Sequence, residues 1–183
     1  MKRKKIEYMI SKYKVISLKK LIMVNGTMGV GKSTVCNILF KMINNSMYLD
    51  GDWCWNMNPF VVSEEDKEMV INNISYLLKS YLSNSKYEYI IFCWVMHEDS
   101  IIMQILNELK EFDFELHKIS LICSEESLKS RLNIDIKNGI RNDDIVNRSI
   151  KRILLYDKMD TIKIDVSNIT PDDTAKEIYK MIK

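Results

Sequence analysis

The segment from Gly26 to Ser33 constrains the fold of this chain more than any other part of the sequence. It reads Gly-Thr-Met-Gly-Val-Gly-Lys-Ser, and the apolar run at residues 21–24 stands directly before it. This spacing is typical of a loop between a β-strand and an α-helix whose backbone N–H groups turn inward around phosphate oxygens. The segment therefore predicts a strand, a phosphate-binding loop and a helix in succession. An ordinary glycine-rich turn is the alternative.

Each residue type in this loop has a separate physical role. The glycines let the backbone approach phosphate oxygens, Lys32 places a positive charge on the outer phosphates, and Ser33 offers a hydroxyl to Mg²⁺. Apolar residues after Lys32 recur near helical spacing, so bound phosphates would lie at a helix N-terminus. The predicted binding residues for a nucleoside triphosphate are Gly26, Thr27, Met28, Gly29, Val30, Gly31, Lys32, Ser33 and Thr34.

Length and composition indicate one folded domain. The chain has 183 residues, 46% of them hydrophobic, with five glycines and two prolines. No low-complexity linker divides it, and its longest apolar run, residues 90–96, is far shorter than the ~18 residues that a membrane span requires. We therefore expect residues 21–183 to form one domain without membrane association.

Charge is distributed unevenly around the formal net charge of +2. Residues 1–20 contain eight lysines or arginines and one acid, so they carry +7 and the remainder carries −5. The body of the chain therefore lacks the basic surface of a protein that binds nucleic-acid polymers. We expect residues 1–20 to be a basic N-terminal extension, either solvated or in contact with an anionic surface.

Two further observations bear on the cellular compartment. The basic segment lacks the apolar stretch and the cleavage site of a secretory signal. The four cysteines stand far apart, without the spacing of a zinc site, and are typical of reduced thiols; they are Cys36, Cys54, Cys93 and Cys123. We expect a cytoplasmic protein.

Strand and helix patterns alternate along the chain. Apolar runs typical of strands occupy residues 21–24, 46–49, 90–95, 116–123 and 162–166. Helical periodicity separates them, and caps at Ser63 and Thr170 open two of the helices. The alternation predicts an α/β fold with a five-stranded parallel sheet covered by helices on both faces. Ligands of such sheets bind beyond the carboxyl ends of the strands, where Asp50, His97 and Asp165 would lie with the glycine-rich loop.

These residues together resemble the small P-loop kinases, which include gluconate, shikimate and adenylylsulfate kinases, chloramphenicol phosphotransferase and the nucleoside monophosphate kinases. The resemblance spans residues 21–183. It rests on the loop at 26–33, on residues 49–52 and 164–167, and on Arg131 and Arg141 near Gly139. It implies a P-loop NTPase fold with strand order 2-3-1-4-5, ATP and Mg²⁺ as ligands, and a mobile lid around residues 131–152.

The resemblance also implies roles for individual side chains. Asp50 would support Mg²⁺ together with Ser33, and Arg131 would contact the nucleotide. The catalytic residues would be Lys32, Arg141 and Asp52, the last of which would engage the acceptor hydroxyl. Residues two apart on a strand point the same way, so both carboxylates would face one site. Ordinary turn chemistry is the alternative for this Asp-Gly-Asp segment.

Several residues near the carboxyl ends of the predicted strands have more than one possible role. The strand at 90–95 is followed by His97 and Glu98 rather than by the acid of a second nucleotide-binding motif. Glu98 has a possible metal-linked role, and His97 is either a base or a structural side chain. The aromatic residues at 53–60 either stack on a planar or sugar-like acceptor or anchor a subdomain. Arg148 and Arg152 are more typical of a solvated helix face.

We predict an ATP-dependent phosphotransferase that moves the γ-phosphoryl group to a small-molecule or nucleotide acceptor. A nucleotide, a sugar acid and an antibiotic are all open as acceptors, and the oligomeric state is open as well. The alternative is a nucleotide-dependent ATPase or switch that acts on a partner protein. Slow hydrolysis that no acceptor stimulates would favour that alternative.

Overall fold

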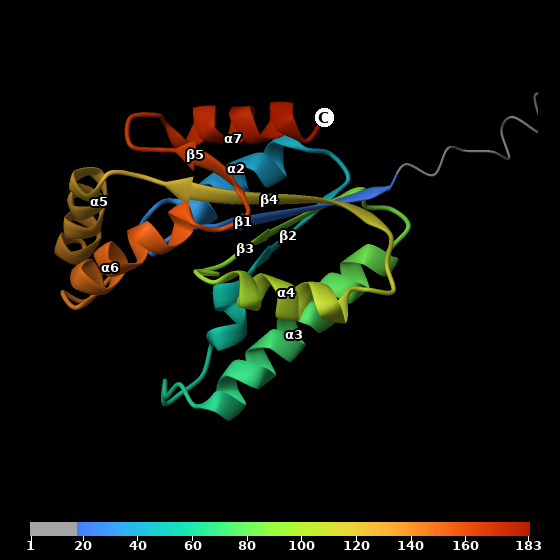
Figure 1. The fold of residues 1–183 in the computed structure, drawn as a ribbon, viewed down its shortest axis with the longest axis horizontal. Helices are drawn as coiled ribbons and strands as arrows, with labels where there is room; N and C mark the ends of the chain where they lie inside the picture. The colour runs from blue at the N-terminus through green and yellow to red at the C-terminus, as the bar shows by residue number, and fades with distance from the viewer. Residues whose placement is uncertain (1–17) are drawn as a thin grey trace, which may run out of the picture.

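The computed structural model describes residues 18–183, so most of the basic extension expected at residues 1–20 lies outside the described part (Figure 1). Its last two residues, Lys19 and Lys20, belong to the first strand. The elements are β1 (Lys19–Asn25), α2 (Lys32–Met42), β2 (Ser46–Asp50), the 3₁₀ helix η1 (Gly51–Trp55), α3 (Glu64–Ser83), β3 (Tyr89–Cys93), α4 (Asp99–Glu108), β4 (Phe114–Ile122), α5 (Glu125–Lys137), α6 (Ile145–Asp157), β5 (Ile162–Asp165) and α7 (Pro171–Met181).

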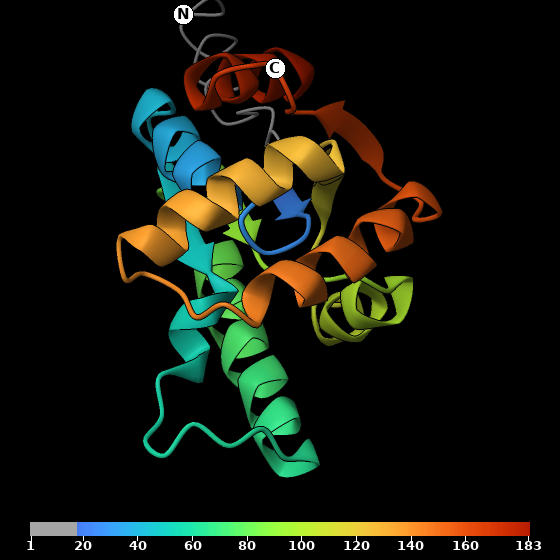
Figure 2. The same cartoon turned by 90° about the vertical axis from the view of Figure 1, so that its left-hand side faces the viewer.

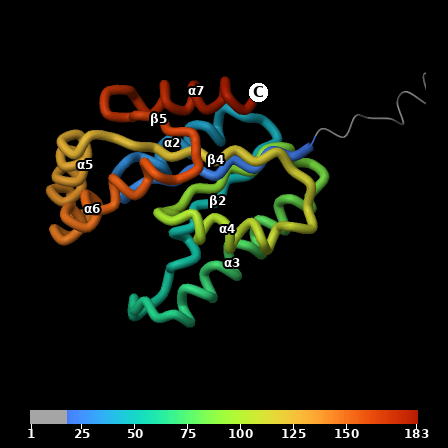
Figure 3. Tube along the Cα trace, in the orientation of Figure 1, coloured from blue at the N-terminus to red at the C-terminus, as the bar shows by residue number. Residues whose placement is uncertain are grey.

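The strands form one five-stranded sheet in the order β2-β3-β1-β4-β5. Every neighbouring pair is parallel, with Ile22 of β1 opposite Ile91 of β3 and His117 of β4. The predicted P-loop NTPase fold and its strand order 2-3-1-4-5 are therefore confirmed. Because all strands run the same way, their carboxyl ends lie at one edge of the sheet, as Figure 3 traces.

Helices cover both faces of the sheet (Figure 1). Ile22 and Val24 of β1 pack in one core with residues of α2 and α7, whereas Leu21 and Met23 pack in a second core with residues of α3 and α4. This alternation follows from the period of two in a β-strand, which sends successive side chains to opposite faces. Helices α5 and α6 lie across the carboxyl end of the sheet (Figure 2), so they cover the edge where ligands of such sheets bind.

The helix boundaries follow the capping signals in the sequence. Ser63 caps α3 in a reciprocal capping box with Asp66, and Thr170 caps α7 with Pro171 in the first turn. The lid expected around residues 131–152 is formed by two helices, α5 and α6, and Gly139 in their connection has a φ of +69°. No helix within residues 18–183 is long and apolar enough to cross a membrane.

Candidate functional site

The glycine-rich loop joins β1 to α2 at the carboxyl edge of the sheet. Gly29 has a φ of +81°, in the left-handed region that favours glycine. A Cβ at Gly29 would lie 2.4 Å from Cδ2 of Leu132 on α5, so the loop packs directly beneath that helix. The Thr27 hydroxyl donates to the backbone carbonyl of Ser149 on α6 at 2.8 Å in a buried hydrogen bond. The loop is therefore fixed by both helices of the α5–α6 pair.

Lys32 is held inside this loop. Its side chain is only 8% exposed, and its Nζ donates to the carbonyl oxygens of Gly26 at 2.9 Å and Thr27 at 3.0 Å. Burial lowers the pKa of Lys32, and the charges of Asp52 and Asp50 act in the opposite direction. Because α2 begins at Lys32, the N–H groups of its first turn have no partners within the helix. The loop thus combines free amides with a buried cation.

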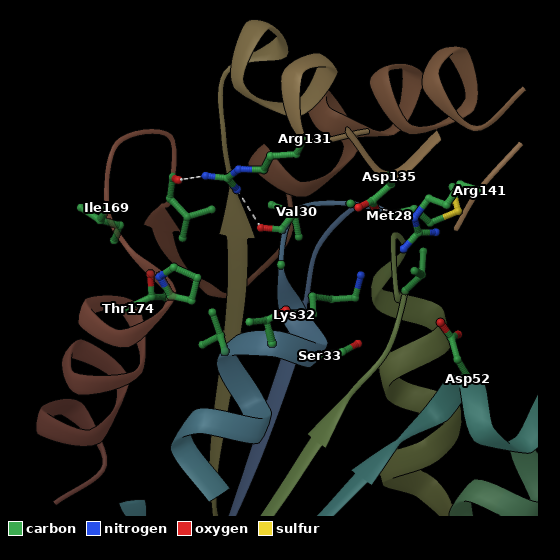
Figure 4. Close-up of a pocket in the computed structure, with 17 residues that line it drawn as sticks. Met28, Val30, Lys32, Ser33, Asp52, Arg131, Asp135, Arg141, Ile169 and Thr174 are labelled. Atoms are coloured by element: carbon green, nitrogen blue, oxygen red, sulfur yellow. Dashed lines mark hydrogen bonds and ion pairs between the residues drawn. The ribbon is translucent and has the colours of Figure 1, made fainter. Parts of the chain in front are cut away.

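A cavity of about 390 Å³ opens over the loop (Figure 4). The loop and the start of α2 form its polar part, and Val166, Ile169 and Pro171 form an apolar part. Arg131 on α5 connects the two parts, because Nη1 donates to the Val30 carbonyl at 2.9 Å and Nη2 donates to the Val166 carbonyl. This shape and polarity suit a phosphate chain attached to an apolar ring.

The two acids after β2 do not lie on one strand. β2 ends at Asp50, and the chain turns at Gly51 into η1, which contains Asp52. The prediction that strand alternation aims both carboxylates at one site is therefore wrong. Asp50 is 6% exposed; its Oδ1 accepts from the Asp52 backbone N–H at 3.0 Å and its Oδ2 accepts from the Tyr48 hydroxyl at 3.2 Å. Asp50 caps η1 and lines neither cavity, whereas Asp52 lines both.

The carboxyl group of Asp52 has a perturbed pKa. Burial raises its pKa, and repulsion by Asp50 raises it further. Lys32, Arg141 and a side-chain hydrogen bond with Trp94 oppose this shift. A partly buried carboxylate with increased proton affinity is suited to accept a proton from a bound hydroxyl group.

A second cavity, of about 870 Å³, adjoins the first and shares Met28, Asp52, Val95 and Arg141 with it. Its aromatic lining residues are Trp53, Trp55, Phe60 and Trp94, and its cationic lining residues are Lys67, Arg141, Arg148 and Arg152. Arg148 and Arg152, which the sequence placed on a solvated helix face, both line this cavity. Arg148 is nevertheless exposed, as predicted, whereas Arg152 is half-buried. The volume is within the range of small-molecule sites.

Arg141 lines both cavities, and Figure 4 shows it beside Asp135 in the first cavity. Arg141 lies in the segment that joins α5 to α6. Its Nε donates to Oδ2 of Asp135 on α5 at 3.0 Å, and this ion pair fixes the position of the guanidinium. The positive charges of Lys32 and Arg141 both lower the pKa of Asp52. The three side chains predicted to be catalytic therefore lie within electrostatic reach of one another.

His97 and Glu98 lie differently with respect to the second cavity. His97 lines it, and its Nε2 is 3.8 Å from Oε1 of Glu98, which does not line it. Burial and the positive charge of Arg152 lower the pKa of His97, and the charge of Glu98 acts in the opposite direction. No group of three or more His, Cys, Asp or Glu side chains that could hold a metal ion occurs within residues 18–183. A metal at this site would depend on Ser33 and on the ligand's own oxygens.

Sequence reasoning missed several lining residues. Asp135, Ile169 and Thr174 line the first cavity, and Lys67 and Ile101 line the second. For Ile169 the available signal was its position just after the last predicted strand, at the ligand-binding edge of the sheet. Thr174 lies farther on, near the start of α7. Nothing in the sequence around Lys67 indicates that α3 reaches the site.

Three solved structures share this architecture. The tunicamycin resistance protein of Deinococcus radiodurans superposes with a TM-score of 0.69 at 17% identity, over 90% of this chain and 95% of that chain. The Mycobacterium tuberculosis APS kinase in complex with AMPPNP and APS gives 0.61 at 14% identity, over 90% and 98%. The Acinetobacter baumannii shikimate kinase in complex with shikimate gives 0.60 at 17% identity, over 90% and 93%. The fold is that of the small P-loop kinases, as the resemblance predicts.

The sequence profile of the AAA domain family matches residues 22–151, which extend from β1 into α6. The chain therefore belongs to the AAA domain family. No curated protein sequence matches it significantly.

Proposed function

We propose that this protein is a cytoplasmic, Mg²⁺-dependent phosphotransferase that moves the γ-phosphoryl group of ATP to a small-molecule or nucleotide acceptor. The observation that carries the proposal is the junction of the two cavities at Asp52 and Arg141. A donor in the first cavity and an acceptor in the second would meet beside a carboxylate and a guanidinium. The four cysteines are free thiols, which agrees with a reducing compartment.

The residues around the first cavity fit a magnesium-bound nucleoside triphosphate. The Lys32 ammonium and the first turn of α2 provide a cation and free N–H groups for the phosphates. The Ser33 hydroxyl lines the cavity and would be the protein's direct ligand to the metal. Asp50 lines neither cavity, so it would support the metal only through its negative charge. Arg131 and the apolar residues after β5 would enclose the base.

Asp52 would act as the general base of the transfer. Its carboxylate would accept the proton of the acceptor hydroxyl while the hydroxyl oxygen forms a bond to the γ-phosphorus. The bond between the γ-phosphorus and the bridging oxygen breaks, and its electron pair leaves with ADP. Lys32 and Arg141 would stabilise the charge on the transferring group. Helices α5 and α6 would serve as the lid that excludes water during the reaction.

The proposal is tested by a screen of hydroxyl-bearing acceptors coupled to ADP release. The purified chain, with Mg²⁺ and ATP, is expected to release ADP much faster with its acceptor than without one, and Lys32→Ala is expected to show no stimulation. The library should span nucleosides and nucleotides, sugars and sugar acids, and aminoglycoside and nucleoside antibiotics. Slow ADP release that no acceptor changes would instead indicate an ATPase or a switch.

A further inference from the structure

One wall of the second cavity is aromatic. Trp55 lies in η1, Phe60 in the loop before α3, and Trp94 directly after β3. Their rings pack together, with centroids 6.2 Å apart for Trp55 and Phe60 and 6.4 Å apart for Trp55 and Trp94. Trp53 adds a side chain that is 58% exposed. This wall offers apolar ring faces to a ligand, and such faces favour a planar group.

The cations that line the same cavity outnumber its acids. Among the described lining residues Asp52 is the one acid, against four lysine or arginine side chains. Three of these cations already pair with carboxylates: Lys67 with Glu64 at 2.6 Å, Arg141 with Asp135 at 3.0 Å and Arg148 with Asp144 at 3.6 Å.

Arg152 differs from the other three cations. Within residues 18–183 no carboxylate forms an ion pair with it; its Nη1 donates a long hydrogen bond to the sulfur of Met28, at 3.9 Å, and its charge acts on His97 and Tyr156. A guanidinium covered by a neutral ligand would lose water without gaining a compensating partner, which costs free energy. An anionic group on the ligand removes this cost and can accept two parallel hydrogen bonds from the guanidinium.

We propose that the second cavity selects a ligand that carries both a planar ring and an anionic group such as a phosphate or a carboxylate. The ring would pack on Trp55, Phe60 and Trp94, and the anion would bind Arg152 with support from Arg148. The identification of this ligand as the phosphoryl acceptor rests on the proposed function. The binding preference does not, because it follows from the cavity lining alone.

Matched pairs of compounds test this preference by calorimetric titration. The panel contains the nucleosides with their 5′-monophosphates, and hydroxybenzyl alcohols with the corresponding hydroxybenzoates. Ribose 5-phosphate and inorganic phosphate carry the anion without the ring. Titrations are made with and without saturating AMPPNP and Mg²⁺, so that binding in the first cavity is recognised. At least one ring-bearing anion is expected to bind about tenfold or more tightly than its neutral partner and than the compounds without a ring.

Variants test whether the aromatic wall and Arg152 hold the ligand. Arg152→Gln is expected to weaken the anionic member about tenfold, whereas Lys151→Gln, which removes an exposed cation one residue away, leaves its Kd unchanged. Trp55→Leu is expected to weaken it several-fold and Trp55→Phe less, because the second change keeps a ring. Tyr76→Leu on α3, where the side chain is 73% exposed, is the control for the loss of an aromatic side chain. Melting curves confirm that each variant is folded.

Four results of the binding measurements would overturn the inference. They are equal binding of a neutral partner, equal binding of ribose 5-phosphate, wild-type affinity in Arg152→Gln, and no binding of any panel compound. ADP release, measured with the same compounds, separates the two proposals. Transfer to a neutral acceptor without a ring would support phosphoryl transfer and overturn this preference. Binding that depends on Arg152 without any ADP release would do the reverse.

Discussion

Asp52 shows how one position acquires its chemistry from neighbours far away in the sequence. Asp50 is two residues away along the chain, but Lys32, Trp94 and Arg141, which also act on the Asp52 carboxyl group, come from three other segments. Burial and Asp50 raise its pKa, while the cations lower it, so the proton affinity depends on a balance of opposed charges. Removing the acidic neighbour should lower the pKa of Asp52, and removing a cationic neighbour should raise it.

The dependence of kcat/KM on pH reports the pKa of Asp52. A general base must be ionised, so kcat/KM is expected to fall with decreasing pH at a higher pH than the usual aspartate range. Asp50→Asn removes a negative neighbour and should move this acidic limb to lower pH, whereas Arg141→Gln removes a cation and should move it to higher pH. Shifts of both variants in the same direction would show that the limb belongs to another group.

Lys32→Met should abolish phosphoryl transfer and leave the fold intact. The ammonium is buried at an unfavourable cost, shown by its lowered pKa, and its hydrogen bonds go only to two carbonyls of its own loop. Methionine keeps most of the chain length and removes the charge, so turnover is expected to fall by several orders of magnitude with little change in the melting temperature. Wild-type turnover in this variant would contradict the assigned role of Lys32.

At the level of elements, the path of the main chain was more predictable than the directions of side chains. The glycine-rich loop was predicted residue by residue because its spacing encodes its own conformation. The turn at the end of β2 was predicted only as an alternative, because the sequence does not reveal a distant contact there: a Cβ at Gly51 would lie 2.5 Å from Cγ of Trp94. Likewise, helical periodicity places Arg148 and Arg152 on one face of α6 but cannot indicate that an aromatic wall lies across from them.

Arg131 illustrates an element contact that serves the site. It joins the glycine-rich loop, through the Val30 carbonyl, to the segment after β5, through the Val166 carbonyl. Arg131→Gln should loosen both ends of the first cavity and raise the KM for ATP at least several-fold, with a smaller change in the KM for the acceptor. Lys129→Gln, which removes a surface ion pair with Glu125 on the same helix, is the control. A larger change in the KM for the acceptor than in the KM for ATP would contradict the assignment of Arg131 to the first cavity.

The whole molecule places its two cavities along one edge of a sheet whose interior is packed on both faces. Ligands therefore bind a surface that exists only in the folded state. Mg²⁺ and ATP at about 100 times the Kd should stabilise the fold by about 2.7 kcal/mol, which a melting curve detects as a rise of several degrees. The same nucleotide should have little effect on Lys32→Met, and an unchanged melting curve in the wild type would count against nucleotide binding.

The buried hydrogen bond from the Thr27 hydroxyl to the Ser149 carbonyl links the two proposed ligand sites, and we expect it to make binding of the two ligands interdependent. Thr27 belongs to the loop that would hold the donor, and Ser149 lies on the helix that carries Arg148 and Arg152. A ligand that shifts α6 must also shift the loop, so each ligand should change the affinity for the other by the same factor. Titrating each ligand in the presence and absence of the other measures this reciprocity, and Thr27→Val should reduce it. The protein would then recognise its two substrates as a pair rather than one by one.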